Sequence, residues 1–485
     1  MKQSTFAQFI LYRYRYIVGY GLFLAALIAL LYFAGLYVPG ALSEKEMQSA
    51  VISGSLQLNI FAIPSIIDLP YHALQRLSIE LFGLTPFAIK LPSILLAFAT
   101  GIGLLLLLRR WFKQNVAILA AIIAVTAGQF LIIAQSGTPI IMLLFWPTLL
   151  LLCATSVSAK PRFTLGRKIV FFIIAGLSLY TPLSIYVLVA MLFAALFHPH
   201  LRYMLLHLTK WKLLLGFAVG IVLLIPLGLH LFKTPGEILV LLGIPSDLHW
   251  ALLWANAQEL AHLFFGFAAP VLKGELLAPM YGIATTALMA LGLFRLAQDH
   301  HSARTYTIGL WLLILLLFLL LQPSMMAITF VPLLLMLAVG VDTLFREWYG
   351  LFPRNPYARA AALIPLIILI GGLVFTGLDR YLNSYTHHST VAAYFTNDLA
   401  LLKSRLDTHT PTRLITTRQA LPFYTLLEQD YSNLRVSTTL PPSYPEKKIV
   451  VLHAALAQTN LGVPAEIVTS ARKADNMRFY IYKTE

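Results

Sequence analysis

Four side chains suited to acid–base chemistry lie within one stretch, residues 39–85. Glu44 and Glu46 are two positions apart, and Asp68 is followed by His72 at a spacing of one helical turn. A carboxylate can take a proton from an attacking hydroxyl or amine, and a histidine can relay that proton. Glu44, Asp68, Glu46 and His72 are therefore the candidate acid–base residues of the chain.

Each candidate also has a structural interpretation. Ser43 is suited to cap a helix whose first turn holds Glu44, because acids favour a helix N-terminus. Glu46 could balance a neighbouring lysine, which contributes little at a surface. Asp68 precedes Leu-Pro, a typical helix start, and His72 could be a half-buried interface residue. The sequence leaves both interpretations open.

Basic side chains in this stretch and just after it could bind a phosphate. Lys90, Arg76 and Lys45 are the main candidates, and Lys233 and Lys273 lie in a later loop. Lys90 opens an apolar segment, so its alternative role is to extend an ammonium group into the headgroup layer. A lysine makes a point contact with phosphate where an arginine offers a bidentate one.

Metal ligands are sparse in the sequence. Glu259 and His262 share a helix face, but the second histidine of a His-Glu-x-x-His zinc motif is missing. The one cysteine, Cys153, lies in an apolar run and excludes a disulfide framework. The cofactor is unknown from the sequence, and a divalent cation is left open.

The elements that must position these residues are membrane helices. Of the 485 residues, 59% are hydrophobic and 11% are charged, which excludes an ordinary soluble enzyme. Spans need roughly 20 apolar residues each, and we predict eleven. They lie at about 17–38, 86–108, 115–134, 139–157, 169–180, 183–197, 213–232, 280–298, 306–321, 325–345 and 360–378. The fold class is thus an all-α polytopic membrane protein.

The net charge of +15 indicates orientation. With the N-terminus in the cytoplasm, the predicted inner loops hold the excess of lysine and arginine, as the positive-inside rule requires. The charge therefore predicts no nucleic-acid partner. It predicts an integral protein of the cytoplasmic (inner) membrane with its C-terminal end outside. The weakest assignment is 169–197, where two short segments flank Pro182. Two crossings are favoured because they keep the basic loop after residue 197 on the cytoplasmic side.

Two outer loops, 39–85 and 233–279, are longer than a connection requires, and long loops are usually functional. The first contains predicted amphipathic helices at about 42–55 and 70–82. The second contains aromatic residues suited to helices in the interface. We expect both loops to cover a cavity that opens sideways into lipid.

Residues 379–485 differ in composition from the membrane domain, 1–378. They carry ordinary charge and short β-rich runs near 413–416, 448–452 and 478–482. Helical patterns cover 389–407 and 419–429. The sequence predicts a small extracytoplasmic α/β domain.

Residues 41–146 resemble the multispanning GT-C glycosyltransferases, especially the protein O-mannosyltransferase and aminoarabinose-transferase branch. The order and spacing of several short motifs agree with that family. The motifs are Ser43-Glu44-Lys45-Glu46, Asp68-Leu69-Pro70-Tyr71-His72, Leu81-Phe82-Gly83, Lys90-Leu91-Pro92-Ser93 and Arg109-Arg110-Trp111-Phe112.

The resemblance implies an enzyme that transfers a sugar from a polyprenyl-phosphate carrier to a protein, lipid or glycan acceptor at the outer face. An outer-loop carboxylate would act as the base and a cation would bind the phosphate. The expected partners are membrane lipid, the sugar-loaded carrier and an acceptor that the sequence does not identify.

The chain departs from the family at three chemical positions. Ser43 replaces the Asp of an Asp-Glu pair, Gln135 to Ile140 contains no acid, and Gln322 to Met326 contains no cation. The alternative function is therefore a catalytically degenerate GT-C-like protein that binds lipid, glycan or a partner protein. A transporter is disfavoured, because few ionisable residues lie inside the spans.

Overall fold

The computed structural model describes most of the chain. The described residues are 14–36, 41–56, 65–157, 164–207, 210–245, 250–267, 271–273, 276–299, 301–351, 356–384, 394–407, 409–440, 447–459, 461–469 and 478–483.

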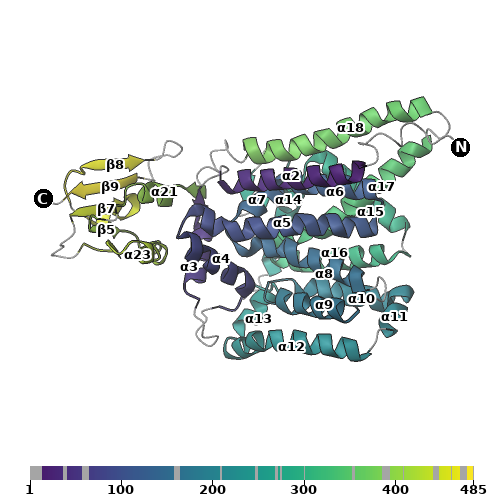
Figure 1. Cartoon of the computed structure of the whole chain (residues 1–485), viewed down its shortest axis with the longest axis horizontal. Helices are drawn as coiled ribbons and strands as arrows, with labels where there is room; N and C mark the ends of the chain where they lie inside the picture. Colours follow the sequence, from purple (N-terminus) through teal and green to yellow (C-terminus); the bar gives the residue numbers. More distant parts are fainter. Residues whose placement is uncertain are drawn as a thin grey trace.

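A helical bundle forms most of the molecule, with a small sheet at one end (Figure 1). Long apolar sequences fold this way because a helix satisfies its own backbone groups where water is absent. The bundle contains α2 (Arg15–Leu36), α5 (Pro86–Trp111), α6 (Gln114–Thr126), α7 (Gly128–Gln135), α8 (Met142–Val157), α9 (Thr164–Ser178), α10 (Ile185–Phe197), α11 (Pro199–Leu206), α12 (Lys210–Lys233), α15 (Ile283–Gln298), α16 (Ala303–Leu321), α17 (Phe330–Leu351) and α18 (Pro356–Asp379).

Every predicted span overlaps one of these helices, but fewer are long enough to cross a membrane alone. Within the described residues, seven helices are long and apolar enough, or up to nine if each bent pair forms one span. The bent pairs are α6 with α7, at 58°, and α10 with α11, at 99°. The helices α9 and α15 have 15 and 16 residues. Eleven crossings therefore remain a prediction.

The segment 169–197 lies in two helices rather than one, and the two crossings that the charge pattern favours remain a prediction. The helices α9 and α10 are separated by a turn, and Leu183 within it adopts a positive φ of 62°. The Leu183 backbone N–H donates to the Leu241 carbonyl oxygen at 2.9 Å. Proline at position 182 cannot donate a helical hydrogen bond, which explains the break.

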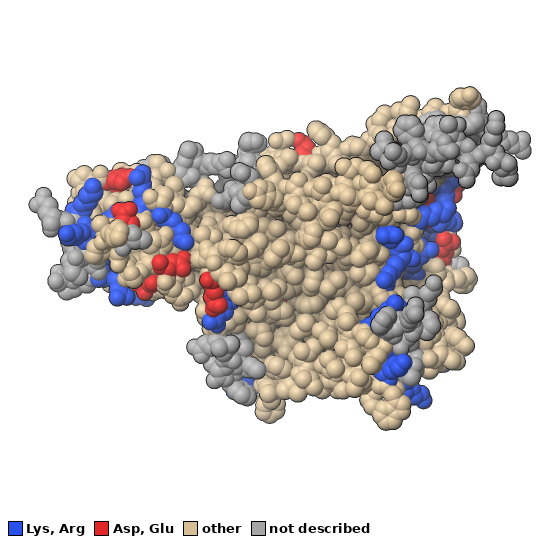
Figure 2. Space-filling model, viewed as in Figure 1, with Lys and Arg blue, Asp and Glu red and all other residues tan. Residues whose placement is uncertain are grey.

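Charged residues avoid the middle of the bundle (Figure 2). Lysine and arginine gather at the end opposite the sheet, while acids and bases are mixed on the sheet itself. The helix ends at the basic end carry Arg109, Arg110, Arg304 and Arg346. This distribution is typical of a membrane protein whose basic end faces the cytoplasm.

The first outer loop forms two antiparallel helices, α3 (Glu44–Gly54) and α4 (Leu69–Phe82), close to the predicted positions. The second contains α13 (Gly236–Leu241), α14 (Leu253–Phe265) and a hairpin of β2 (Val271–Lys273) with β3 (Leu276–Ala278). Parts of the expected cavity cover, 57–64 and 246–249, lie outside the described residues.

The C-terminal region contains a five-stranded sheet in the order β6-β5-β7-β9-β8. Its first three strands are parallel and the last two are antiparallel to their neighbours. The sequence predicted β5, β7 and β9 but missed β6 and β8. The elements are α21 (Asp398–Lys403), β5 (Thr412–Ile415), α22 (Leu421–Thr425), α23 (Leu427–Asp430), β6 (Leu434–Ser437), β7 (Lys448–Leu452), β8 (Glu466–Thr469) and β9 (Arg478–Lys483).

This sheet region shares a hydrophobic core with the first outer loop. Ala50 of α3 and Leu84 are buried in the same cluster as Phe423 and Leu427. The Leu84 backbone N–H also donates to Asp430 Oδ2 at 2.8 Å. The C-terminal region therefore rests on α3 and α4, and the predicted domain boundary at 378/379 remains a prediction.

Two glycines allow α15 and α17 to touch. A Cβ atom on Gly292 would lie 2.0 Å from the Met336 carbonyl oxygen, and one on Gly340 would lie 2.0 Å from the Leu288 carbonyl oxygen. Small residues permit such close backbone approach, which drives helix association in lipid.

We predict that Gly340→Ala lowers the apparent unfolding temperature of the detergent-solubilised protein. Overpacking of this kind costs about 1–3 kcal/mol, because the backbones must separate. Gly309→Ala in α16 is the matched control, since a Cβ there meets nothing within 4 Å. Equal melting temperatures for the two variants would contradict the tight contact.

Candidate functional site

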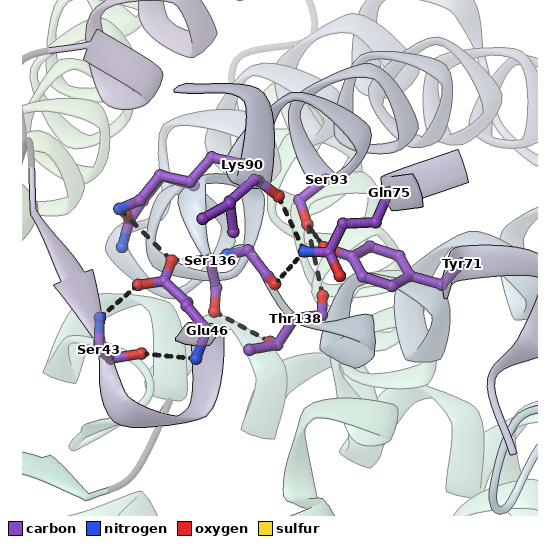
Figure 3. Close-up of polar contacts among 11 residues, drawn as sticks. Ser43, Glu46, Tyr71, Gln75, Lys90, Ser93, Ser136 and Thr138 are labelled. Atoms are coloured by element: carbon purple, nitrogen blue, oxygen red, sulfur yellow. Dashed lines mark hydrogen bonds and ion pairs between the residues drawn. The ribbon is translucent and has the colours of Figure 1, made fainter. Parts of the chain in front are cut away.

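A buried lysine lies where α5 enters the bundle from the sheet end (Figure 3). Lys90 is 1% exposed, and its Nζ lies 3.4 Å from Glu46 Oε1. Nζ also donates to Gln135 Oε1 at 2.7 Å. A buried charge needs such partners, because desolvation otherwise costs several kcal/mol. The sequence alternative of a lysine extended into the headgroups therefore does not describe this structure.

The partner carboxylate is held on both oxygens. Glu46 is fully buried and forms a capping box with Ser43, whose N–H donates to Oε2 at 2.7 Å. Its Oε1 accepts from the Gly137 N–H at 2.6 Å. The capping box fixes the first turn of α3, so the carboxylate is positioned before any ligand binds. We call Glu46, Lys90, Gln135 and Gly137 the Lys90 cluster.

A C-terminal segment covers the Lys90 cluster. β1 (Leu42–Ser43) pairs antiparallel with β4 (Phe395–Thr396). The Lys90 Nζ lies 5.7 Å from the centre of the Phe395 ring, a distance suited to a cation–π contact. The pairing thus places Ser43 and Phe395, about 350 positions apart in the sequence, beside the Lys90 ammonium group.

A second polar layer joins α3, α4 and α5. Gln75 is fully buried, and its Nε2 donates to the carbonyl oxygens of Ile89 at 3.0 Å and Gly137 at 2.8 Å. Its Oε1 accepts from Ser49 and Ser53. Every polar atom of the buried amide has a partner, so the layer fixes how the two outer helices sit on α5.

Asp68 lies at the opposite end of the α3–α4 pair. Ser53 contacts the first turn of α4 and lies seven positions after Glu46, a separation of about 10 Å along the helix. Asp68 is 8% exposed and adopts a left-handed conformation, with φ 53°. Its backbone N–H donates to the Tyr180 carbonyl oxygen at 2.8 Å. The two carboxylates therefore occupy separate sites.

The Asp68 carboxyl group is poised to exchange a proton near neutral pH. Burial raises its pKa to about 7, although a hydrogen bond with Thr181 opposes the shift. Thr181 Oγ1 in turn accepts from Trp146 Nε1 at 3.1 Å. Among the described residues, Asp68 Oδ1 has no hydrogen-bond partner. A pKa near the working pH and a free oxygen are typical of a general base.

A side-chain contact joins α4 and α5 beside the two sites. The Tyr71 hydroxyl, one turn after Asp68, lies 2.8 Å from Ser93 Oγ, one turn after Lys90. Ser93 Oγ also donates to the Thr138 carbonyl oxygen at 3.3 Å. This contact joins α4 to α5 between the two sites.

His72 lies within the helix packing. It is 4% exposed, and its Nδ1 is 2.9 Å from Ser53 Oγ. Burial lowers its pKa to about 4, and the hydrogen bond with Gln75 only partly offsets this. The ring is therefore neutral at pH 7. These contacts favour the structural interpretation, and proton relay by His72 stays a prediction.

The remaining predicted site residues lie on the outside of α3 and α4. Glu44 is exposed and accepts a 3.4 Å hydrogen bond from Gln48. Lys45 is also exposed. Arg76 pairs with Glu80 at 2.6 Å on the outer side of α4. The structure thus brings together Glu46 and Lys90 and leaves Glu44, Lys45 and Arg76 apart from them.

Sequence reasoning missed several members of both sites. Gln75, Gln135, Thr181 and Phe395 carry no charge, so a search for acids and bases passes over them. A glutamine inside an apolar helix is the signal that could have identified Gln135, because a buried amide needs a partner. No local signal identifies Phe395.

Metal binding finds no support in the described part of the chain. No group of three or more His, Cys, Asp or Glu side chains there could hold an ion. Glu259 and His262 lie on α14 without a third ligand of these types. The Lys90 cluster instead presents one ammonium group.

The family of dolichyl-phosphate-mannose-protein mannosyltransferases matches residues 70–230, about a third of the chain. This range contains Lys90 and Gln135 but neither Glu46 nor Asp68. No curated protein sequence matches.

Two solved proteins share the arrangement of helices. ArnT from Cupriavidus metallidurans, in the apo state and bound to undecaprenyl phosphate, superposes with a TM-score of 0.52 at 14% identity, covering 96% of this chain and 98% of ArnT. The chain therefore shares the fold of ArnT over nearly its whole length. The apo oligosaccharyltransferase of Archaeoglobus fulgidus also superposes, with a TM-score of 0.50 at 14% identity, covering 90% of this chain and 62% of that one. The predicted GT-C resemblance is therefore confirmed.

We predict that Glu46 and Lys90 behave as one unit in stability. Glu46→Gln or Lys90→Met alone should cost about 3–5 kcal/mol, because each leaves an uncompensated buried charge. The double variant should recover most of that loss, as measured by unfolding in detergent.

The exposed pair Arg76→Met with Glu80→Gln provides the control and should cost less than about 1 kcal/mol. Additive losses at Glu46 and Lys90 would show that their charges do not compensate each other.

Asp68 should make stability depend on pH. Between about pH 4 and 7 the unfolded chain loses the Asp68 proton while the folded protein keeps it, so stability should fall as pH rises. Asp68→Asn should remove this decline and should melt higher than the wild type at pH 8. Parallel melting curves of the two proteins from pH 4.5 to 8 would contradict the raised pKa.

Proposed function

We propose that the protein is a membrane glycosyltransferase that takes a sugar from a polyprenyl-phosphate carrier and passes it to a protein, lipid or glycan acceptor at the outer face. The observation that carries the proposal is the Lys90 cluster, a fixed cation at the sheet end of a GT-C fold. The match to ArnT, which has been solved with undecaprenyl phosphate, supports this choice of carrier.

Lys90 is the proposed phosphate ligand. Its ammonium has three N–H donors, of which Gln135 and Glu46 engage two, and the Phe395 ring faces the group at 5.7 Å. A phosphate would bind on the side that Phe395 covers, so the β1–β4 contact must shift. A cation placed there stabilises the charge that the leaving phosphate gains during transfer.

Glu46 is proposed to position Lys90. Ser43 and Gly137 already donate to its two oxygens, which leaves the carboxylate poorly placed to accept an acceptor proton. The negative charge of Glu46 instead favours the protonated form of Lys90 and holds its ammonium group in position. Glu44 is exposed on α3, so of the two glutamates Glu46 is the one proposed to act on Lys90.

Asp68 is the proposed general base. The acceptor oxygen or nitrogen attacks the anomeric carbon, the bond from that carbon to the phosphate oxygen breaks, and the bonding electrons leave with the polyprenyl phosphate. The acceptor proton passes to the Asp68 carboxylate. A base with a pKa of about 7 is ionised in a useful fraction of molecules at neutral pH.

The proposed topology follows from the charge distribution. The basic end of the bundle would face the cytoplasm and the sheet end the outside, which puts Lys90 and Asp68 near the outer surface of the inner membrane. Residues 379–485 would then form the predicted outer domain. The carrier tail would lie in lipid beside the helices.

Carrier binding tests the proposal directly. Undecaprenyl phosphate should raise the melting temperature of the purified protein by about 3 °C at roughly 100 times Kd. Lys90→Met should abolish this shift, and Lys45→Met should retain it. An unchanged shift in Lys90→Met would remove Lys90 from phosphate binding.

Transfer tests the base. With polyprenyl-phosphate mannose or aminoarabinose as donors, Asp68→Asn should lower kcat by about 10²–10⁴-fold, and Glu44→Gln should not. The wild-type rate should rise with pH through about 7, since the base must be ionised. Full activity in Asp68→Asn would exclude it as the base.

The degenerate alternative gives a distinct result. The segment η5 (Pro323–Thr329), between α16 and α17, carries no cation, and Met326 there is fully buried. Carrier binding through Lys90 without transfer of any sugar tested would favour this alternative.

A further inference from the structure

A large apolar cavity lies at the basic end of the bundle, opposite the sheet. Its volume is about 530 Å³, and it is lined mainly by apolar side chains of α8, α9, α10 and α11. Phe171, Leu188, Met191 and Met204 are among them. Cavities of this size are large enough for a ligand of several hundred daltons.

The helix geometry explains the cavity. Tyr186 of α10 stacks on Phe318 of α16, with ring centres 4.0 Å apart, near the end of α10 that faces the sheet. On the other side, Gly216 and Gly220 let α12 approach Phe172 of α9 closely. At the opposite end of α10 the chain bends by 99° into α11. A wedge-shaped space therefore remains between the α10–α16 pair and the α9–α12 pair.

Two cations line the cavity, both at its basic end. Lys168 lies in the second turn of α9, and Arg304 lies in the first turn of α16. Arg304 donates to the Trp111 carbonyl oxygen at 2.8 Å and lies 5.2 Å from the Phe112 ring centre. These contacts fix the guanidinium at the rim. No acidic side chain lines the cavity among the described residues.

The nearest acids belong to a neighbouring cavity that Arg304 also borders. Asp299 pairs there with Arg295 at 3.3 Å, and Asp342 pairs with Arg346. Each carboxylate thus has its own arginine. The rim of the large cavity therefore keeps a positive potential.

We infer that this cavity binds an anionic glycerophospholipid of the cytoplasmic leaflet. Its acyl chains would fill the apolar wedge, and its phosphate would lie between Lys168 and Arg304. Basic pockets between membrane helices on the cytoplasmic side recognise acidic headgroups in this way. The site lies at the other end of the bundle from Lys90, so the inference does not depend on sugar transfer.

The test uses the purified, delipidated protein and defined lipids. Phosphatidylglycerol should raise the melting temperature by about 3 °C at roughly 100 times Kd, while zwitterionic phosphatidylethanolamine should not. The variant Lys168→Gln/Arg304→Gln should weaken phosphatidylglycerol binding about 25-fold, since each cation contributes about fivefold. Arg202→Gln/Lys210→Gln, at exposed basic positions of the same end, should bind as the wild type does.

A second variant tests the wedge without changing charge. Ala154→Leu/Ala195→Leu fills the cavity and should also abolish the shift. Equal stabilisation by phosphatidylethanolamine, or an unchanged shift in either lining variant, would overturn the inference. The absence of any shift with phosphatidylglycerol would also overturn it. A shift with undecaprenyl phosphate that Lys168→Gln/Arg304→Gln abolishes and Lys90→Met retains would instead assign the cavity to the carrier.

Discussion

The buried pair of Glu46 and Lys90 is the interaction on which the outer half of the molecule depends. A lysine that opens an apolar helix has no water to solvate it once α3 and β4 cover it. It needs a carboxylate, and the carboxylate needs donors of its own, which Ser43 and Gly137 supply. Desolvation therefore forces several segments to meet at one point.

This requirement makes the outer loop part of the folded core. α3 contacts α5 through Lys90 and the segment after α7 through Gly137. The strand β1 that precedes α3 pairs with β4 of the C-terminal region. Tertiary contacts rather than helix propensity therefore stabilise a helix of 11 residues. A ligand that binds Lys90 would act on all three connections.

The two carboxylates of the region suit different tasks because their surroundings differ. Glu46 is saturated with donors, whereas Asp68 is buried with one free oxygen in a strained backbone conformation. Strained, incompletely paired residues persist where function requires them. Separate sites, joined through Tyr71 and Ser93, fit a division between binding phosphate and moving a proton.

The sequence by itself determined the membrane class, the helix positions and the importance of the 39–85 stretch and Lys90, because hydropathy and charge are local properties. It could not choose between Glu44 and Glu46, which differ by about 200° around α3. The choice between these two glutamates depended on which face of α3 packs against α5. The roles of Gln135 and Phe395 were likewise decided by tertiary structure, since desolvation of Lys90 arises only when distant segments close around it.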